Sequence, residues 1–388
     1  MKTQNAQTPR LLVLLALGCL AFPPMAQAVN PPPDGGYPGG NTAEGYNALL
    51  GLTAGGYNTA VGWFSLGSNN EGNFNTAIGA GALFVNITAD ENTATGAGAL
   101  FSNITGTANT ANGAFALFNN GGGLENSSTP GGVFIASFNT ANDNRALFSN
   151  TSGNSNTATG AGALTEDTTG NTNTAVGISA LSQNTTADDN TAVGAVALFD
   201  NTTGTQNTAI GSSALHNNST GSNNTANGYQ ALSSNFSGDR NTATGWQALF
   251  SNTGANNNTA DGFQALLSNT TGNNNTGIGF GALGTSTTAN ANTAIGANAL
   301  SNTTGSGNIA LGSAAGNAVV AGDNNIHIGN GGKQYRHRDH PYWRSGSSDA
   351  NLHRWHPRGG NRSCERRQRA NRLQRSARHT EFLTPIQT

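Results

Sequence analysis

Apolar and polar residues alternate along this chain in a unit of 17 residues that repeats over most of its length. Counted from its first residue, the unit reads Asn-Thr-Ala-x-Gly-x-x-Ala-Leu and continues into a polar stretch that often reads Asn-Thr-Thr-Gly. Two runs of units begin at Asn41, Asn58, Asn75, Asn92 and Asn109, and at Asn139, Asn156, Asn173, Asn190, Asn207, Asn224, Asn241, Asn258, Asn275 and Asn292. A period held this strictly is typical of a solenoid, in which each unit stacks on a copy of itself.

The first five positions of the unit predict a short β-strand that ends at a turn. Position 3 is Ala in every regular unit except one, which has Gly277, whereas position 4 varies freely. A small fixed residue beside a variable one is the period of two expected of a strand with one buried face, and the Gly at position 5 permits a turn. We therefore expect a mainly β fold, a parallel β-solenoid (β-roll) with 17 residues per coil. The second half of each coil is either a turn of helix or a second short strand.

Two further positions predict how the coils are held together. Position 9 is Leu in every regular unit from Leu49 to Leu300, so stacking forms one apolar column. Each buried Leu contributes about 1.5–3 kcal/mol of transfer free energy. The recurrent Asn at position 1 favours a ladder of side-chain amides along the rod.

The repeat also marks the boundaries of the array. It fills residues 41–331, including two worn units at Asn308 and Asn325, and it follows a Pro/Gly leader at 29–40. The step from Asn109 to Asn139 is one unit plus 13 residues, so we interpret 121–138 as a loop that leaves the stack intact.

Residues 1–28 have the features of a cleaved signal peptide. Lys2 and Arg10 precede a short apolar core, and Ala26-Gln27-Ala28 resembles a cleavage site. Lipoprotein processing at Cys19 is the alternative. If cleavage follows Ala28, the mature chain keeps one cysteine, Cys364, and no apolar segment long enough to cross a membrane. We expect a secreted or cell-surface protein.

The last segment, 332–388, has a different composition. From residue 333 it holds 13 of the 17 Lys and Arg residues, whereas 29–332 carries 2 basic and 15 acidic residues. A frame shift near residue 332 accounts for both the charge and the lost periodicity. A genuine basic tail accounts only for the charge, and nothing in it predicts a specific nucleic-acid site.

The array offers little for catalysis or metal binding, because only 9% of the chain is charged. His216 and His327 have no acidic or Cys residue at metal-ligand spacing. We expect no enzyme activity, no metal and no cofactor. We expect three acidic pairs to lie in polar turns facing water, at Asp90-Glu91, Glu166-Asp167 and Asp188-Asp189.

Aromatic residues at position 6 are the candidate contact surface. They occupy four consecutive coils and two coils near the start of the array: Tyr229, Trp246, Phe263 and Phe280, then Tyr46 and Trp63. An exposed strip would suit a host, matrix or carbohydrate ligand. The alternative is ordinary packing in a core or a subunit interface.

The units at 75–83 (Asn-Thr-Ala-Ile-Gly-Ala-Gly-Ala-Leu) and 308–312 (Asn-Ile-Ala-Leu-Gly) resemble head repeats of YadA-like trimeric autotransporter adhesins. Related repeats occur in phage tail fibres. The resemblance covers 41 to about 331 and implies a left-handed β-roll, a homotrimer, surface display and adhesion. The unit here is longer than is usual in that family.

These observations predict a secreted or surface-exposed repeat protein that acts as an adhesin-type head through non-catalytic contact. One alternative is a structural spacer or extracellular-matrix fibre. Another is a protein like a phage tail fibre that lacks its C-terminal module.

Overall fold

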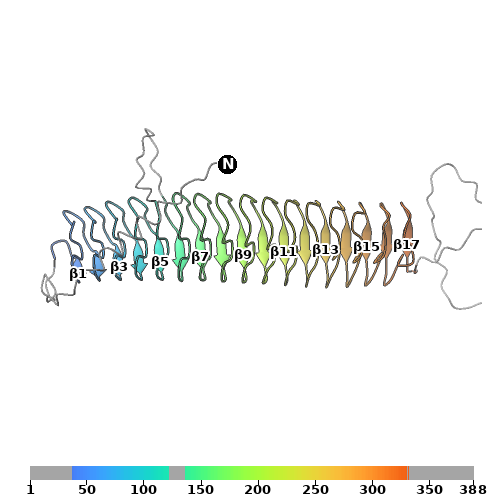
Figure 1. Ribbon diagram of the computed structural model, residues 1–388, viewed down its shortest axis with the longest axis horizontal. Coiled ribbons are helices and arrows are strands. Elements are labelled where there is room, and N and C mark those ends of the chain that lie inside the picture. Colours follow the sequence, from blue (N-terminus) through green and yellow to red (C-terminus); the bar gives the residue numbers. More distant parts are fainter. Residues whose placement is uncertain (1–36, 122–135, 330, 332–388) are drawn as a thin grey trace, which may run out of the picture.

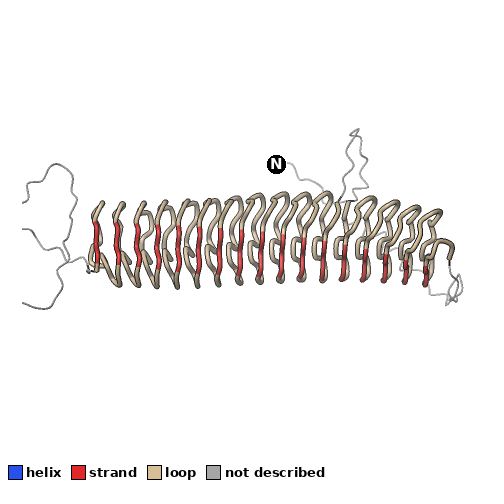
Figure 2. The backbone as a smooth tube through the Cα atoms, turned by 180° about the vertical axis from the view of Figure 1, so that it is seen from behind, coloured by secondary structure: helices blue, strands red, loops and turns tan. Residues whose placement is uncertain are grey.

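The computed structural model describes residues 37–121, 136–329 and 331, which form one rod of stacked coils (Figure 1). Each coil contributes a single three-residue strand, and all the strands belong to one parallel sheet along the rod (Figure 2). The strands are β1 Thr42–Glu44, β2 Thr59–Val61, β3 Thr76–Ile78, β4 Thr93–Thr95, β5 Thr110–Asn112, β6 Thr140–Asn142, β7 Thr157–Thr159, β8 Thr174–Val176, β9 Thr191–Val193, β10 Thr208–Ile210, β11 Thr225–Asn227, β12 Thr242–Thr244, β13 Thr259–Asp261, β14 Thr276–Ile278, β15 Thr293–Ile295, β16 Ile309–Leu311 and β17 Ile326–Ile328. The predicted parallel β-solenoid is confirmed. Below, coils carry the number of their strand.

Each strand pairs in register with the strand of the next coil, so equivalent positions form columns along the rod. Thr59 lies beside Thr76 and Ala60 beside Ala77. The register continues across the insert, where Thr110 pairs with Thr140. It also continues across coil 15, which is one residue short, since Thr293 pairs with Ile309. Residues 1–36, 122–135 and 332–388, which include the predicted signal peptide and tail, lie outside the described residues.

The rest of the coil is neither the helical turn nor the second strand that the sequence left open. In the described residues it consists of turns and bends. Positions 7, 9 and 17 have left-handed backbone in most coils, as at Leu66 with φ of 49°. Inter-coil backbone bonds persist there, because the Leu66 N–H donates to the Ala82 carbonyl at 3.0 Å. The left-handed conformation costs about 1–2 kcal/mol per non-Gly residue, which the burial of the same Leu offsets.

The Gly at position 5 is required by both conformation and space. Gly79 has φ of 136°, and a Cβ there would lie 2.5 Å from the carbonyl oxygen of Gly96 in the next coil. Only a residue without a side chain lets adjacent coils approach this closely. Asp143 replaces it in coil 6 with φ of 92°.

The apolar interior is a set of columns of Ala and Leu. The Ala of positions 3 and 8 and the Leu of position 9 are fully buried from coil 3 to coil 13, as Ala192, Ala197 and Leu198 are in coil 9. Each coil therefore adds a very small apolar cross-section, and only stacking over many coils builds a core.

Buried asparagines form the other half of the interior. The predicted ladder at position 1 is confirmed: Asn58 Oδ1 accepts the backbone N–H of Asn75 at 2.9 Å. The Asn58 amide donates to the carbonyl of Gly72, at position 15 of its own coil, at 2.8 Å. Because an amide carries both donor and acceptor groups, identical side chains in register can satisfy one another.

A second buried amide ladder, at position 12, was not predicted. Asn86 donates to Asn69 Oδ1 at 2.8 Å and to the Ala89 carbonyl at 2.9 Å. That carbonyl also accepts from Asn75, so both ladders converge on position 15. The ladder begins at Asn69 and ends at Asn269, because Ser286 in the next coil is too short to continue it.

Candidate contact surface

Two outward columns border each other along the sheet. The Ala at position 3 points inward, so the side chain at position 4 points outward, and position 6 follows it beyond the Gly turn. Large apolar side chains at both positions are between a third and two thirds exposed, as at Val193 and Ile178. These two columns, at positions 4 and 6, are the outer columns referred to below.

Four of the candidate aromatic residues form one continuous stack in coils 11–14. The ring centroids of Tyr229 and Trp246 lie 6.3 Å apart, and those of Trp246 and Phe263 lie 4.7 Å apart. Phe263 and Phe280 follow at 5.4 Å, and neighbouring planes are within 16° of parallel. The side chains are 39–53% exposed. Ring faces therefore meet one another and ring edges face outward, which suits contact with a protein surface better than stacking of a sugar on a ring face.

A short glutamine ladder flanks this stack at position 7. Gln247 donates to Gln230 Oε1 at 2.8 Å, and Gln264 donates to Gln247 Oε1 at 3.1 Å. The three amides lie one residue after Tyr229, Trp246 and Phe263. Coils 11–13 thus present apolar ring edges beside a row of ordered amides.

The other two candidate aromatic residues, in coils 1 and 2, are arranged differently. Tyr46 and Trp63 each make an edge-to-face contact with Phe64, with centroids at 6.1 Å and 4.6 Å. Phe64 is at position 7, so both rings contact a neighbouring column and do not form a position-6 stack. The structure therefore brings together Tyr229, Trp246, Phe263 and Phe280 but leaves Tyr46 and Trp63 in a separate cluster.

Position 10 carries a second aromatic stack, whose residues were not among the candidate contact residues. Phe84, Phe101, Phe118 and Phe148 stack with centroids 4.9–5.2 Å apart. The guanidinium of Arg145 lies 4.8 Å from the centre of the Phe148 ring. The four Phe side chains are half-buried. The same 17-residue spacing that identified position 6 was enough to find them.

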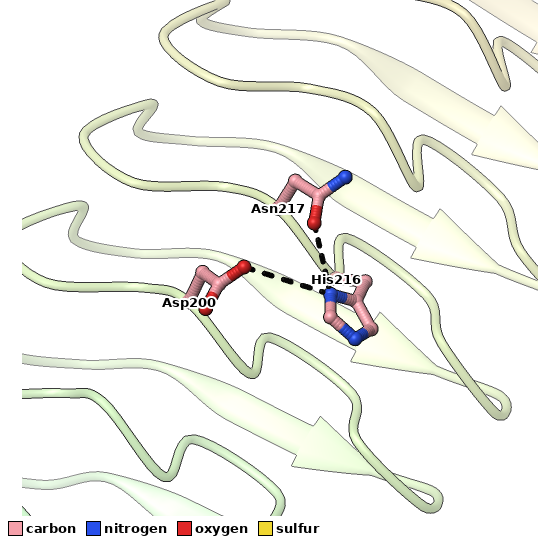
Figure 3. A network of polar contacts seen from close by, with 3 residues as sticks. All are labelled: Asp200, His216 and Asn217. Atoms are coloured by element: carbon pink, nitrogen blue, oxygen red, sulfur yellow. Dashed lines mark hydrogen bonds and ion pairs between the residues drawn. The ribbon is translucent and has the colours of Figure 1, made fainter.

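His216 belongs to the polar contact drawn in Figure 3. Its Nδ1 lies 3.0 Å from Asn217 Oδ1 and 3.7 Å from Asp200 Oδ2, and its ring packs at 5.3 Å from Phe199. Asp200 is one residue short of a full repeat away, so stacking brings together two residues that appeared isolated in the sequence. Within the described residues there is no group of three or more His, Cys, Asp or Glu side chains suited to a metal ion.

Asp167 corrects one prediction. It was expected to face water in a polar turn, but it occupies position 12 of coil 7 and is fully buried in the amide ladder. Its Oδ1 accepts from Asn184 at 2.7 Å, and its Oδ2 has no partner. Because Oδ1 takes the acceptor place of the ladder, Oδ2 takes the place of the side-chain amide nitrogen of the position-12 Asn in other coils. That nitrogen donates to carbonyl oxygens, as Asn86 does.

This environment favours the protonated acid. Burial raises the pKa of Asp167 from 3.8 to about 8; hydrogen bonds from Asn184 and the Gly170 backbone oppose the shift, and the nearby charge of Asp188 adds to it. Burial thus shifts the Asp167 carboxyl toward its protonated form, which can replace an amide as a donor.

The position-12 ladder accounts for part of the Asn-x-Thr and Asn-x-Ser triplets of the array, whereas others, such as the one at Asn223, begin at exposed position-17 residues. Asn86, Asn103, Asn184 and Asn201 each begin such a triplet, and each is a fully buried position-12 residue. In the folded rod these amides are engaged in the ladder and closed to modification.

Comparisons of the chain with protein-family models, with curated proteins and with solved structures found no match. The described residues contain no helix capable of crossing a membrane. The β-solenoid with 17-residue coils is therefore established by the structure itself.

Proposed function

We propose that this protein is a secreted or surface-exposed rod of adhesin-head type that acts by non-catalytic contact. The observation that carries the proposal is the exposed aromatic stack at Tyr229, Trp246, Phe263 and Phe280. A continuous exposed apolar strip of this kind is typical of a protein-interaction site. A pure spacer would have no need of it. The resemblance of the repeats to YadA-like adhesin heads supports the same function.

The rest of the coil suits a rigid display element. From coil 2 to coil 13, two buried amide ladders and a Leu column fix each coil on the next, so the outer columns can vary without altering the stack. Seventeen strands spaced about 4.8 Å apart give a rod roughly 80 Å long. Such a rod can hold a contact surface away from the point where the chain is anchored.

The test uses beads coated with the mature chain, residues 29–388. Attachment is counted on cultured epithelial cells, on immobilised fibronectin or collagen, and on beads coated with the same chain. The matched control is Trp246→Ser combined with Phe263→Ala, because Ser and Ala already occupy position 6 in other coils. We expect the wild-type beads to attach to at least one surface and the variant beads to attach at least about tenfold less. Attachment no greater than that of uncoated beads on every surface would favour the spacer or matrix fibre instead.

A further inference from the structure

The outer column at position 4 is patterned in blocks. Its exposed side chains are apolar in coils 2–3, 8–10 and 14–17, and polar in coils 4–7 and 11–13. The central block is Val176, Val193 and Ile210. The stack does not require this pattern, because the fold accepts Thr95, Asn112 or Asp261 at the same position. A surface property must account for it.

The pattern reads nearly the same in both directions from coil 9. If coil n of one rod faces coil 18 − n of another, Val193 meets its own copy. Apolar residues then meet apolar residues, and polar residues meet polar residues, in six of eight pairs. The exceptions are Glu44 with Ile328 and Thr95 with Ile278. The matching pairs are Val61–Leu311, Ile78–Ile295, Val176–Ile210, Asn112–Asp261, Asn142–Thr244 and Thr159–Asn227.

The outer column at position 6 follows the same register, but by size. Each large side chain whose counterpart is described would face a small or medium-sized one, and no two large side chains would meet. The aromatic stack of coils 11–14 falls opposite the small residues of coils 4–7. The pairs are Trp63–Ser313, Phe280–Ala97, Phe263–Ala114, Trp246–Asn144, Tyr229–Ala161 and Ile178–Ser212.

We propose that two copies of this chain pair side by side and antiparallel through the outer columns, about a two-fold axis at Val193. The proposal rests on the proposed function and names the partner of the aromatic stack as a second copy. A two-fold axis along the strand direction keeps column facing column while reversing coil order, as an isologous interface requires. An in-register parallel assembly, such as the homotrimer that the resemblance implies, would instead place the aromatic stacks at the same level.

The area of the outer columns and their low charge are both consistent with a second copy of the chain as the partner. A face about 80 Å long and four residues wide covers roughly 1,000 Å² per rod, close to the 800 Å² per partner of a standard interface. The described part of the position-6 column carries no charged residue, and position 4 carries only Glu44 and Asp261. Depletion of charge is a mark of interface cores.

Disulfide trapping tests the register. Every chain in this experiment carries Cys364→Ser, which removes the native thiol. Two such chains, one with Ile78→Cys and the other with Ile295→Cys, are prepared separately, mixed and then oxidised. We expect cross-linked dimers in the mixture and in Val193→Cys alone, but not in Ile78→Cys alone. Cross-linking of Ile78→Cys to itself would establish a parallel assembly and overturn the proposal. Absence of the mixed product would overturn it as well.

A charge on the axis tests the interface by sedimentation velocity. Val193→Asp places two carboxylates face to face, and Asp261 shows that the fold accepts Asp at position 4. We expect the dimer Kd to rise at least about tenfold. Thr203→Asp, an exposed position of the same coil away from the outer columns, is the control and should pair like wild type. An equimolar mixture of Val193→Asp and Val193→Lys should pair again. If Val193→Asp pairs as tightly as wild type, the proposal is wrong.

The bead assay separates this proposal from the function it rests on. Rods that stay monomeric while their beads attach to cells or matrix would defeat the pairing and leave the adhesin function standing. Rods that pair while their beads attach neither to cells nor to matrix would defeat the adhesin function and leave the pairing standing.

Discussion

In coil 9, Ala192 and Leu198 point inward and match their counterparts in nearly every coil, whereas Val193 and Ala195 point outward at positions whose residue changes from coil to coil. The inward positions are constrained by copies of themselves directly above and below. The outward positions meet no such constraint within the rod. Uniformity therefore identifies what holds the stack together, and variation identifies what the stack can present to a partner.

The largest expected effect of an interior change is at Asp167, the one acid in the position-12 ladder. Asp167→Asn should restore a regular amide ladder. The pKa of Asp167 is raised in the folded state, so its contribution to stability is full below about pH 4, falls as pH rises and levels off above about pH 8. The loss is roughly 1.4 kcal/mol per pH unit and on the order of 5 kcal/mol in total.

Denaturant unfolding of residues 29–388, with and without Asp167→Asn, between pH 4 and pH 9 measures this difference. We expect the variant to gain most at pH 8 and little at pH 4. Equal pH dependence of the two proteins would mean that Asp167 reaches water and lies outside the ladder.

Leu198→Ala should be the next largest change, because it opens a cavity in the Leu column. The expected local cost is about 2–5 kcal/mol. Hydrogen exchange of coils 8–10, read by mass spectrometry, should show faster exchange there than in distant coils. Thr203→Ala, at an exposed position of the same coil away from the outer columns, is the control and should leave exchange nearly unchanged. A cost below about 0.5 kcal/mol would be typical of a surface position and would contradict the core assignment.

A smaller, stabilising effect is expected where the position-12 ladder ends. Asn269 Oδ1 and Ser286 Oγ are both buried without a partner. Ser286→Asn places an amide nitrogen next to Asn269 Oδ1 and should add about 1 kcal/mol. Thermal unfolding of this variant should be compared with Ser313→Asn, an exposed position-6 control. A lower melting temperature for Ser286→Asn would show that the C-terminal coils cannot accept the ladder.

Much of this interior could be predicted from the sequence, because a strict repeat reports every constraint many times. The strand, the buried Ala and Leu columns and the position-1 ladder all followed from residues that recur at one spacing. The position-12 ladder escaped notice because its Asn lies in a stretch that reads like a polar turn. For the same reason, Asp167 was wrongly predicted to face water.

The conformation of the second half of the coil could not be predicted. Left-handed backbone at a buried Leu such as Leu66 contradicts the local preference of that residue, and only stacking makes it favourable. The contact surface could be predicted only in part. The repeat spacing identified the aromatic residues, but it could not show which rings stack. Tyr46 and Trp63 are one coil apart, yet each packs edge-to-face with Phe64.

The most direct test of the contrast between inner and outer positions is one variant with two readouts. Tyr229, Trp246, Phe263 and Phe280 are all replaced by Ala, the residue found at position 6 in many other coils. We predict that far-ultraviolet circular dichroism and cooperative unfolding are retained while sedimentation shows that self-association is lost. Loss of the folded signal would place these rings in the core, and undiminished association would show that the outer columns do not make the contact.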